Sequence, residues 1–155
     1  MLSSMSKEQW GRATWYLFHT LSHNLKPERT DLVGPLLNVI LNMCANLPCQ
    51  DCSGHAERTM ASLRKDMIKT PRDLAMMMWM FHNKVNERLR ARHMTLEEHD
   101  EMYSRARLVE VVNHFMAVMN QRMGNERAMV YSMSRRNAVA GVLKFVKNNV
   151  DAFNT

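Results

Sequence analysis

The sequence has few residues that break regular secondary structure. Five glycines and four prolines occur among 155 residues, too few for the many turns of an all-β sandwich. No alternating strand pattern and no internal repeat is present. Helix start signals, in contrast, recur along the chain. The sequence therefore predicts an all-α fold.

Long apolar runs and abundant cysteine are also missing. No run approaches the roughly 18 apolar residues that a membrane span needs. The first residues, MLSSMSKEQWGRATWYLF, lack a basic region followed by an apolar stretch, so we expect no signal peptide. Three cysteines do not make a secreted disulfide framework. We expect an intracellular protein, in which two close cysteines more often serve catalysis or metal binding than stability.

Composition leaves a moderately basic globular chain. Hydrophobic residues make up 46%, and 21 Lys and Arg against 15 Asp and Glu give a net charge of +6 with His neutral. The charge fits an ordinary basic surface, an acidic partner or a bound phosphorylated cofactor. A nucleic-acid interface would use the arginines, but no binding motif accompanies them, so we expect no nucleic-acid partner. The arginines in question are Arg88, Arg90, Arg92, Arg135 and Arg136.

Capping residues divide the chain into six predicted helices. Ser6 with Gln9 and Thr95 with Glu98 have the spacing of capping boxes, and Thr70 precedes a proline suited to the first helical position. Gly124 would end the fifth helix and Asn125 would cap the sixth. The predicted ranges are 6–22, 31–46, 49–67, 70–90, 95–123 and 125–150. Short connections between them predict a helical bundle.

The fourth predicted helix has two rows of side chains. One is an apolar row typical of a buried face. Beside it, Trp79, His82, Asn83 and Asn86 recur at i, i+3, i+4 and i+7. Each of them singly fits an ordinary role, as a core tryptophan, a hydrogen-bonded histidine or an exposed amide. Together, these flat hydrogen-bonding groups suit a planar heteroaromatic ligand.

The first predicted helix has a similar face. Arg12, Trp15 and His19 follow at i, i+3 and i+7, with Tyr16 four residues after Arg12. A separate row is apolar. Two faces with aromatic and imidazole groups in one small bundle favour a ligand held between them.

The segment LPCQDCSGH, residues 47–55, contains a CxxC pair, Cys49 and Cys52. The predicted helix start at Cys49 would favour a thiolate there, which suits a redox disulfide. Cys44 and His55 lie close enough in sequence to complete a four-ligand zinc site in a helical adaptor protein. The spacing alone leaves both interpretations open.

Three motifs taken in order resemble the Erv/ALR family of FAD-linked sulfhydryl oxidases. They are WGRATWYLFHTL at 10–21, PCQDCSGH at 48–55 and WMFHNKVNERL at 79–89. The HNxVN element, which follows the CxxC by about thirty residues, is the most specific. The resemblance covers about residues 7–103 and favours redox chemistry over zinc. It implies a four-helix bundle core that binds FAD, at residues 1–103, with a helical extension at 104–155.

The resemblance also assigns roles to residues. Cys49 and Cys52 would be the catalytic pair, with Cys52 next to the flavin and Cys49 facing the substrate; no metal is implied. The cofactor contacts implied are Gly11, Arg12, Trp15, His19, Cys52, His55, Trp79, His82, Asn83, Val85, Asn86, Leu89 and Tyr103.

Some positions depart from the family pattern. Leu47 stands where many members have tyrosine, and Ala91 where many have lysine, so Arg90 and Arg92 are candidates to bind the pyrophosphate. Many members also have a second cysteine pair as a shuttle. Here Cys44 is the only other cysteine, so the substrate would react with Cys49 directly.

The resemblance implies partners as well. They are dithiol-containing protein substrates, molecular oxygen reduced to hydrogen peroxide, and a second copy in a non-covalent homodimer around the first two helices. The apolar face of the second predicted helix fits either a core or that interface; it comprises Leu32, Leu36, Val39, Ile40 and Met43. The short chain with its extension is most similar to members from large DNA viruses. That predicts the host cytoplasm or the virion rather than the mitochondrial intermembrane space.

Overall fold

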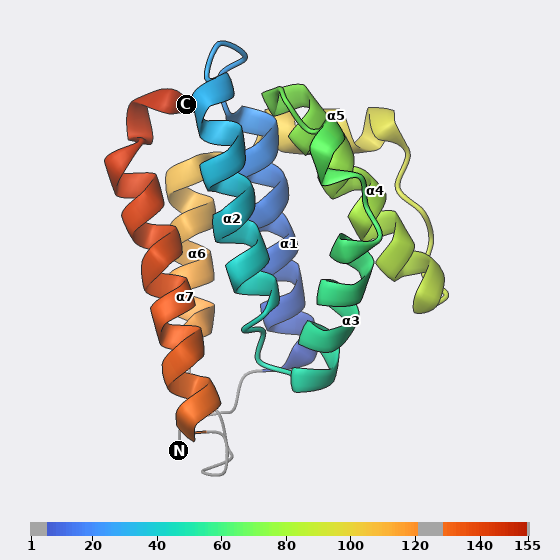
Figure 1. Ribbon diagram of the computed structural model, residues 1–155, viewed down its shortest axis with the longest axis vertical. Helices are drawn as coiled ribbons and strands as arrows, with labels where there is room; N and C mark the ends of the chain where they lie inside the picture. The colour runs from blue at the N-terminus through green and yellow to red at the C-terminus, as the bar shows by residue number, and fades with distance from the viewer. Residues whose placement is uncertain (1–5, 121–128, 155) are drawn as a thin grey trace.

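The computed structural model describes residues 6–120 and 129–154, with the side chains of 129–131 left out. This part of the chain is helical apart from loops and one isolated β-bridge between Leu25 and Phe153, which confirms the all-α prediction (Figure 1). The α-helices are α1 (Lys7–Asn24), α2 (Val33–Cys44), α3 (Gln50–Ala61), α4 (Pro71–Arg88), α5 (Leu96–Ser104), α6 (Leu108–Met119) and α7 (Met129–Asn148). Short 3-10 turns occur at η1 (Thr30–Leu32), η2 (Lys65–Met67) and η4 (Val150–Ala152).

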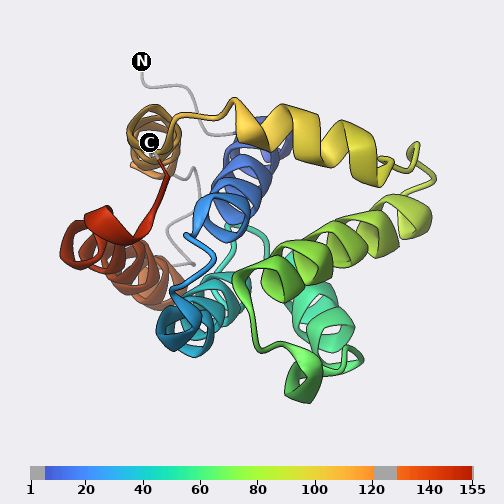
Figure 2. The same cartoon turned by 90° about the horizontal axis from the view of Figure 1, so that it is seen from above.

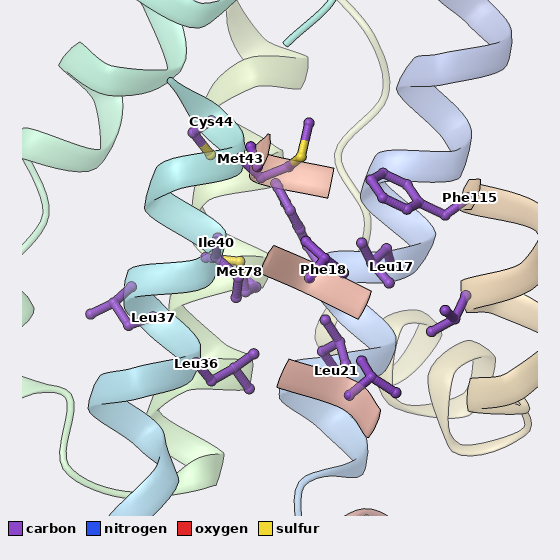
Figure 3. Packing of buried hydrophobic residues seen from close by; sticks show 14 of the residues in the cluster. Leu17, Phe18, Leu21, Leu36, Leu37, Ile40, Met43, Cys44, Met78 and Phe115 are labelled. Carbon is purple, nitrogen blue, oxygen red and sulfur yellow. The ribbon is translucent and has the colours of Figure 1, made fainter. Parts of the chain in front are cut away.

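Helix α1 lies at the centre of the bundle. It packs against α2, α4, α5 and α6, while α7 packs along α2 (Figures 1 and 2). One cluster of buried side chains fills the space between these helices. In Figure 3, Leu17 of α1 lies near Phe115 of α6, Leu21 lies farther along α1, and Leu36 and Ile40 belong to α2. All five of these side chains are fully buried, and each contributes about 1.5–3 kcal/mol through removal from water.

Local capping explains where the helices begin. The Ser6 hydroxyl accepts a hydrogen bond from the Gln9 backbone, and the Gln9 side chain returns one, as the capping box predicts. Thr70 and Asp73 form the same reciprocal pair ahead of Pro71. These bonds satisfy backbone N–H groups that lack partners in the first helical turn.

The cap at Thr95 is only half of the predicted box. Its hydroxyl accepts from the Glu98 N–H at 3.1 Å. The Glu98 carboxylate accepts from Arg92 instead of from the Thr95 backbone, with two contacts of 3.0 Å. A charge-assisted pair with a guanidinium is stronger than a hydrogen bond to a neutral amide. The Glu98 carboxylate therefore binds Arg92 rather than the Thr95 N–H.

Two predicted helices were too long. The third ends at Ala61 rather than 67, and η2 follows separately. The fifth does not run from 95 to 123: α5 ends at Ser104 and α6 begins at Leu108. Because of the break, α5 and α6 can run in different directions over α1 (Figure 2). As a result His99 and Tyr103 of α5 and Phe115 of α6 are all buried. The predicted stop and cap at Gly124 and Asn125 lie outside the described residues.

The C-terminal helices pack against the first two. Helix α6 covers α1 and α7 covers α2, and Val112, Phe115 and Val142 join the same buried cluster as the N-terminal helices. The chain end is fastened to the end of α1 by two backbone hydrogen bonds, Lys26 N–H to Ala152 at 2.9 Å and Asn154 N–H to Asn24 at 2.7 Å.

The apolar face of α2 is therefore core within one chain. Leu36, Ile40 and Met43 have no exposed surface. Of the two interpretations of this face, core or dimer interface, the structure supports the first. None of the helices in the described ranges is long and apolar enough to cross a membrane.

Candidate active site

Cys49 and Cys52 form a disulfide at the start of α3, with their Cα atoms 5.2 Å apart. Cys49 is the N-cap residue, and its Sγ accepts a hydrogen bond from the Cys52 N–H at 3.2 Å. The adjacent turn is held by the Leu47 N–H, which donates to Ser53 Oγ at 2.8 Å. The positive end of the helix dipole therefore lies at both sulfurs. It stabilises a thiolate on either one when the disulfide opens.

The four candidate zinc ligands do not form a metal site in the described part of the structure. In residues 6–120 and 129–154, no three His, Cys, Asp or Glu side chains are arranged to hold a metal ion. Cys44 is buried, Cys49 and Cys52 are bonded to each other, and His55 Nδ1 lies 3.0 Å from an Arg58 nitrogen. The four predicted ligands are thus not assembled around a common point.

A cavity of about 580 Å³ opens beside Cys52, between α1, α3 and α4. Its volume is in the range of small-molecule and cofactor sites. Cys52 lines it and Cys49 does not. The two cysteines of the disulfide therefore differ in position: Cys52 lines the cavity, and Cys49 lies outside the lining and is partly exposed.

Most of the predicted cofactor residues meet at this cavity. They are Gly11, Arg12, Trp15, Cys52, His82, Val85, Asn86 and Leu89. The structure thus brings together the two helix faces singled out in the sequence, with α1 on one side and α4 on the other.

Stacked rings form one wall of the cavity. The ring centroids of Trp15 and His82 are 4.0 Å apart with an interplanar angle of 8°. Phe81 meets Trp15 edge to face at 4.9 Å. Such contacts fix ring orientations beyond the effect of burial alone. The wall therefore presents preformed flat surfaces to a ligand.

The positive charges at the cavity come from Lys7, Arg12 and Arg88. Arg12 also pairs with Glu8 at 2.8 Å. Sequence reasoning missed Lys7 and Arg88, although Lys7 lies one helical turn before Gly11 on the same face. Neither Arg90 nor Arg92, the predicted pyrophosphate ligands, lines the cavity; Arg92 is paired with Glu98.

Trp79 and Asn83 lie outside the cavity lining and hold the loop before α5. The Trp79 indole N–H donates to the Met94 carbonyl at 2.8 Å. The Asn83 side chain donates to the same carbonyl at 2.9 Å and accepts from the Met94 N–H at 2.9 Å. The polar groups of Trp79 and Asn83 thus bind the backbone of Met94 in this loop. The helical periodicity of the sequence did not indicate that partner.

The remaining predicted residues also lie outside the lining. His55 contacts Arg58, as described above. His19 is fully buried, and its Nε2 lies 2.8 Å from His82 Nδ1. Tyr103 stacks on His19 with centroids 4.5 Å apart. His19 and Tyr103 therefore support the cavity wall from the side away from the cavity.

The histidines at this wall are neutral near pH 7. Burial, and secondarily the neighbouring His99, lowers the pKa of His82 to about 4. Burial, followed by the charge of His82, lowers the pKa of His19 well below its usual range. In both cases the cost of removing an imidazolium from water is the larger cause.

Cys44 lines the inner part of the cavity with 1% of its surface exposed. Burial, and to a smaller extent the charge of Glu57, raises the pKa of the Cys44 thiol to about 12. A thiol that stays protonated at neutral pH is a poor nucleophile. Cys44 therefore behaves as a small core residue.

The fold and the site define a helical-bundle protein with a disulfide at a helix N-terminus beside an aromatic-walled cavity. Residues 12–105 of the 155 match the Erv1 / Alr family, and the chain belongs to that family. It is similar to the FAD-linked sulfhydryl oxidase ERV2 of Saccharomyces cerevisiae, with 36% identity over 87 residues. The matched stretch covers 54% of this chain and 43% of the yeast protein, so the chain spans less than half of that relative.

Proposed function

We propose that this protein is an FAD-dependent thiol oxidase that forms disulfides in dithiol substrates and passes the electrons to molecular oxygen. The observation that carries the proposal is the asymmetry of the disulfide: Cys52 lines the cavity, while its partner Cys49 lies outside the lining. Membership of the Erv1 / Alr family and the similarity to a yeast FAD-linked sulfhydryl oxidase support it.

The residues present fit FAD. Trp15 and His82 offer flat surfaces for its ring systems, and Lys7, Arg12 and Arg88 offer positive charge for its pyrophosphate. Asn86 adds an amide for ring edges or hydroxyls. When bound, FAD supplies the acceptor for the two electrons released as the Cys49–Cys52 disulfide re-forms, and it passes them to oxygen to give hydrogen peroxide.

Disulfide exchange is the part of the reaction that the chain's own residues perform. A substrate thiolate attacks Cys49 Sγ, a bond forms between the two sulfurs, and Cys52 leaves as a thiolate. The first turn of α3 stabilises that leaving group. The second substrate thiolate then attacks the mixed disulfide at the substrate sulfur. The substrate leaves with its own disulfide, Cys49 is released as a thiolate, and the two substrate thiols have lost two protons.

This scheme uses no second cysteine pair to carry electrons from the substrate to Cys49. Cys44 is the only cysteine besides the reactive pair, and it is buried. The substrate therefore approaches the partly exposed Cys49 directly. The non-covalent homodimer implied by the family resemblance stays a prediction. Its contact surface would lie outside the faces of α1 and α2 that α6 and α7 cover.

The test uses the purified full chain. We expect the visible absorption of an oxidised flavin, and oxygen uptake with hydrogen peroxide formation when dithiothreitol or a reduced dithiol protein is added. FAD released by denaturation should approach one molecule per chain. A colourless protein that gains no flavin from added FAD and consumes no oxygen would contradict the proposal.

A further inference from the structure

A chain of hydrogen-bonded side chains runs from the surface of the bundle to the cavity wall. Arg72 of α4 makes two contacts of 2.8 Å to the Asp100 carboxylate. Asp100 Oδ1 lies 3.1 Å from His99 Nδ1. His99 Nε2 lies 3.2 Å from His19 Nδ1, and His19 Nε2 lies 2.8 Å from His82 Nδ1. Three helices, α1, α4 and α5, contribute to this chain.

The carboxylate at one end determines the direction of every bond. An ionised carboxylate only accepts hydrogen bonds, so Nδ1 of His99 must donate. In a neutral imidazole the other nitrogen then accepts, which requires His19 Nδ1 to donate. The same argument makes His19 Nε2 an acceptor and His82 Nδ1 a donor. Each of the three rings is thereby held in the tautomer with its proton on Nδ1.

Asp100 and His82, at the two ends of this series of hydrogen bonds, are both held in place. The bonds to Arg72, followed by the bond to His99, lower the pKa of Asp100 to about 2, so the carboxylate is ionised at neutral pH. At the other end, the ring of His82 is fixed by stacking on Trp15. One other titratable group reaches the carboxylate, His23, whose Nε2 lies 3.5 Å from Asp100 Oδ1.

We propose that Asp100 and His99 are positioning residues that act through His19 to hold His82 as a hydrogen-bond acceptor at the cavity. His82 uses Nδ1 within the chain, so Nε2 is its only ring nitrogen left for a ligand in the cavity. That nitrogen accepts from an N–H or O–H group, such as the amine, imide or hydroxyl groups of FAD. The inference rests on the proposed function for the identity of the ligand, but not for the tautomers themselves.

The sequence did not indicate this role for Asp100 or His99. Both lie on α5, after the last of the three motifs, in a segment with an ordinary helical pattern. His99 is nevertheless fully buried. A buried imidazole with both ring nitrogens engaged is costly to replace, because its partners are left unsatisfied.

The direct test is nitrogen NMR of the histidine rings in the full chain, as purified and after FAD addition, near pH 7. The nitrogen chemical shifts distinguish a ring protonated on Nδ1 from one protonated on Nε2, the form that free neutral histidine favours in water. We expect His19, His82 and His99 all to be protonated on Nδ1. A proton on Nε2 of His82 would overturn the proposal, and no variant has to fold for that result.

Two variants then distinguish the effect of losing the Asp100 carboxylate from the effect of losing its ion pair with Arg72. Asp100→Asn and Arg72→Gln both remove the Arg72–Asp100 ion pair, but only the first puts an amide in place of the carboxylate that His99 requires. We expect Asp100→Asn to lose the Nδ1-protonated form at His82 and to bind FAD about tenfold more weakly, the scale of one lost hydrogen bond to a buried group. Arg72→Gln should keep the tautomers.

Glu98→Gln is the matched control. It also removes one negative charge from α5, but the Glu98 carboxylate is paired with Arg92 and takes no part in the hydrogen bonds between Asp100 and His82. Its tautomers and FAD affinity should equal those of the unmodified protein. If Asp100→Asn gives the same spectrum or the same FAD affinity as Glu98→Gln, the positioning role is wrong. If the unmodified protein binds no FAD, the proposed function fails instead, and the ring spectra still test the tautomers.

Discussion

The two sides of the α1–α2 region are built differently. Toward α6 and α7, the bundle is filled by aliphatic and aromatic side chains such as Leu17, Ile40 and Phe115, all fully buried. Toward α3 and α4, the same α1 presents Trp15 and His19 to the His82 ring of α4 and borders a cavity of about 580 Å³. One side is closely packed and supplies stability, while the other keeps open space and polar groups for a ligand.

The difference shows what each kind of residue does at the same depth in the fold. Apolar side chains reach full burial with no hydrogen-bond requirement. Buried imidazoles require partners, and here each finds one on another helix. Substitutions on the two sides should therefore have separable effects, on stability at one side and on cofactor and turnover at the other.

The largest effect is expected at the disulfide. Cys49→Ser and Cys52→Ser should each reduce dithiothreitol oxidation to background, because either one removes a sulfur of the only pair able to exchange. Oxygen uptake measures this. The Cys49 variant should keep its FAD, since Cys49 does not line the cavity. Cys44→Ala is the control for loss of a thiol: it should retain turnover and cost about 1 kcal/mol of stability. Retained turnover in either serine variant would contradict the assignment of the pair.

Phe115→Ala tests the packed side. Removing a fully buried phenylalanine from α6 should lower the free energy of unfolding by about 3–5 kcal/mol, through lost burial and the cavity left behind. Urea unfolding, with and without added FAD, measures it. The stabilisation gained from FAD should stay the same as in the unmodified protein. Val109→Ala, at a position of the same helix that is 65% exposed, is the control and should change stability little.

The double variant His82→Ala with Asn86→Ala tests the open side. It should lose FAD, and with it the stabilisation that a ligand bound only to the folded state provides, about 2.7 kcal/mol when FAD is present at a hundred times its dissociation constant. Thermal unfolding at several FAD concentrations measures the effect. A melting temperature that still rises with FAD as in the unmodified protein would rule out a cofactor role for this face of α4.

Acid should weaken the open side first. The folded-state pKa of His82 is lowered to about 4, so the unfolded chain binds more protons between about pH 6.5 and pH 4, and stability falls as pH decreases through that window. From pH 7 to pH 5, His82 alone should contribute a loss of about 1–2 kcal/mol. Urea unfolding at both values, with FAD content held constant, measures it.

The matched pair for this test is His82→Gln and His93→Gln. The first should reduce the pH dependence and leave the part that comes from His19 and His99, whose pKa values burial also lowers, while the second changes an exposed histidine and should leave the dependence as it is. An unchanged slope in His82→Gln would show that the pH dependence arises elsewhere.

The smallest effect is expected at Arg90, just beyond α4. It has a φ of 56°, a left-handed conformation that strains residues with a Cβ. Arg90→Gly should raise the free energy of unfolding by about 1 kcal/mol. Arg90→Ala keeps the Cβ and is the control; an equal gain in both variants would assign the effect to the lost charge instead. Urea unfolding of the three proteins decides.

By itself, the sequence determined the features that depend on neighbours a few residues away. The caps at Ser6 and Thr70 use partners three residues on, so a local pattern suffices to predict them. The same holds for the α4 row, since helical periodicity alone places His82 and Asn86 together. The spacing of Cys49 and Cys52, in contrast, left a disulfide and a zinc site both open, and only the resemblance of the three motifs favoured the disulfide.

Only the tertiary structure decided the features that join distant segments. Trp79 and Asn83 share the predicted ligand row, but the Met94 backbone takes their polar groups. The link from Asp100 through His99 to His19 spans 80 residues between the two histidines. The break between α5 and α6 and the burial of the α2 face likewise depend on which helices become neighbours. Packing between helices selects these contacts, and the local sequence pattern, with its period of 3.6 residues, contains no information about which helix lies opposite.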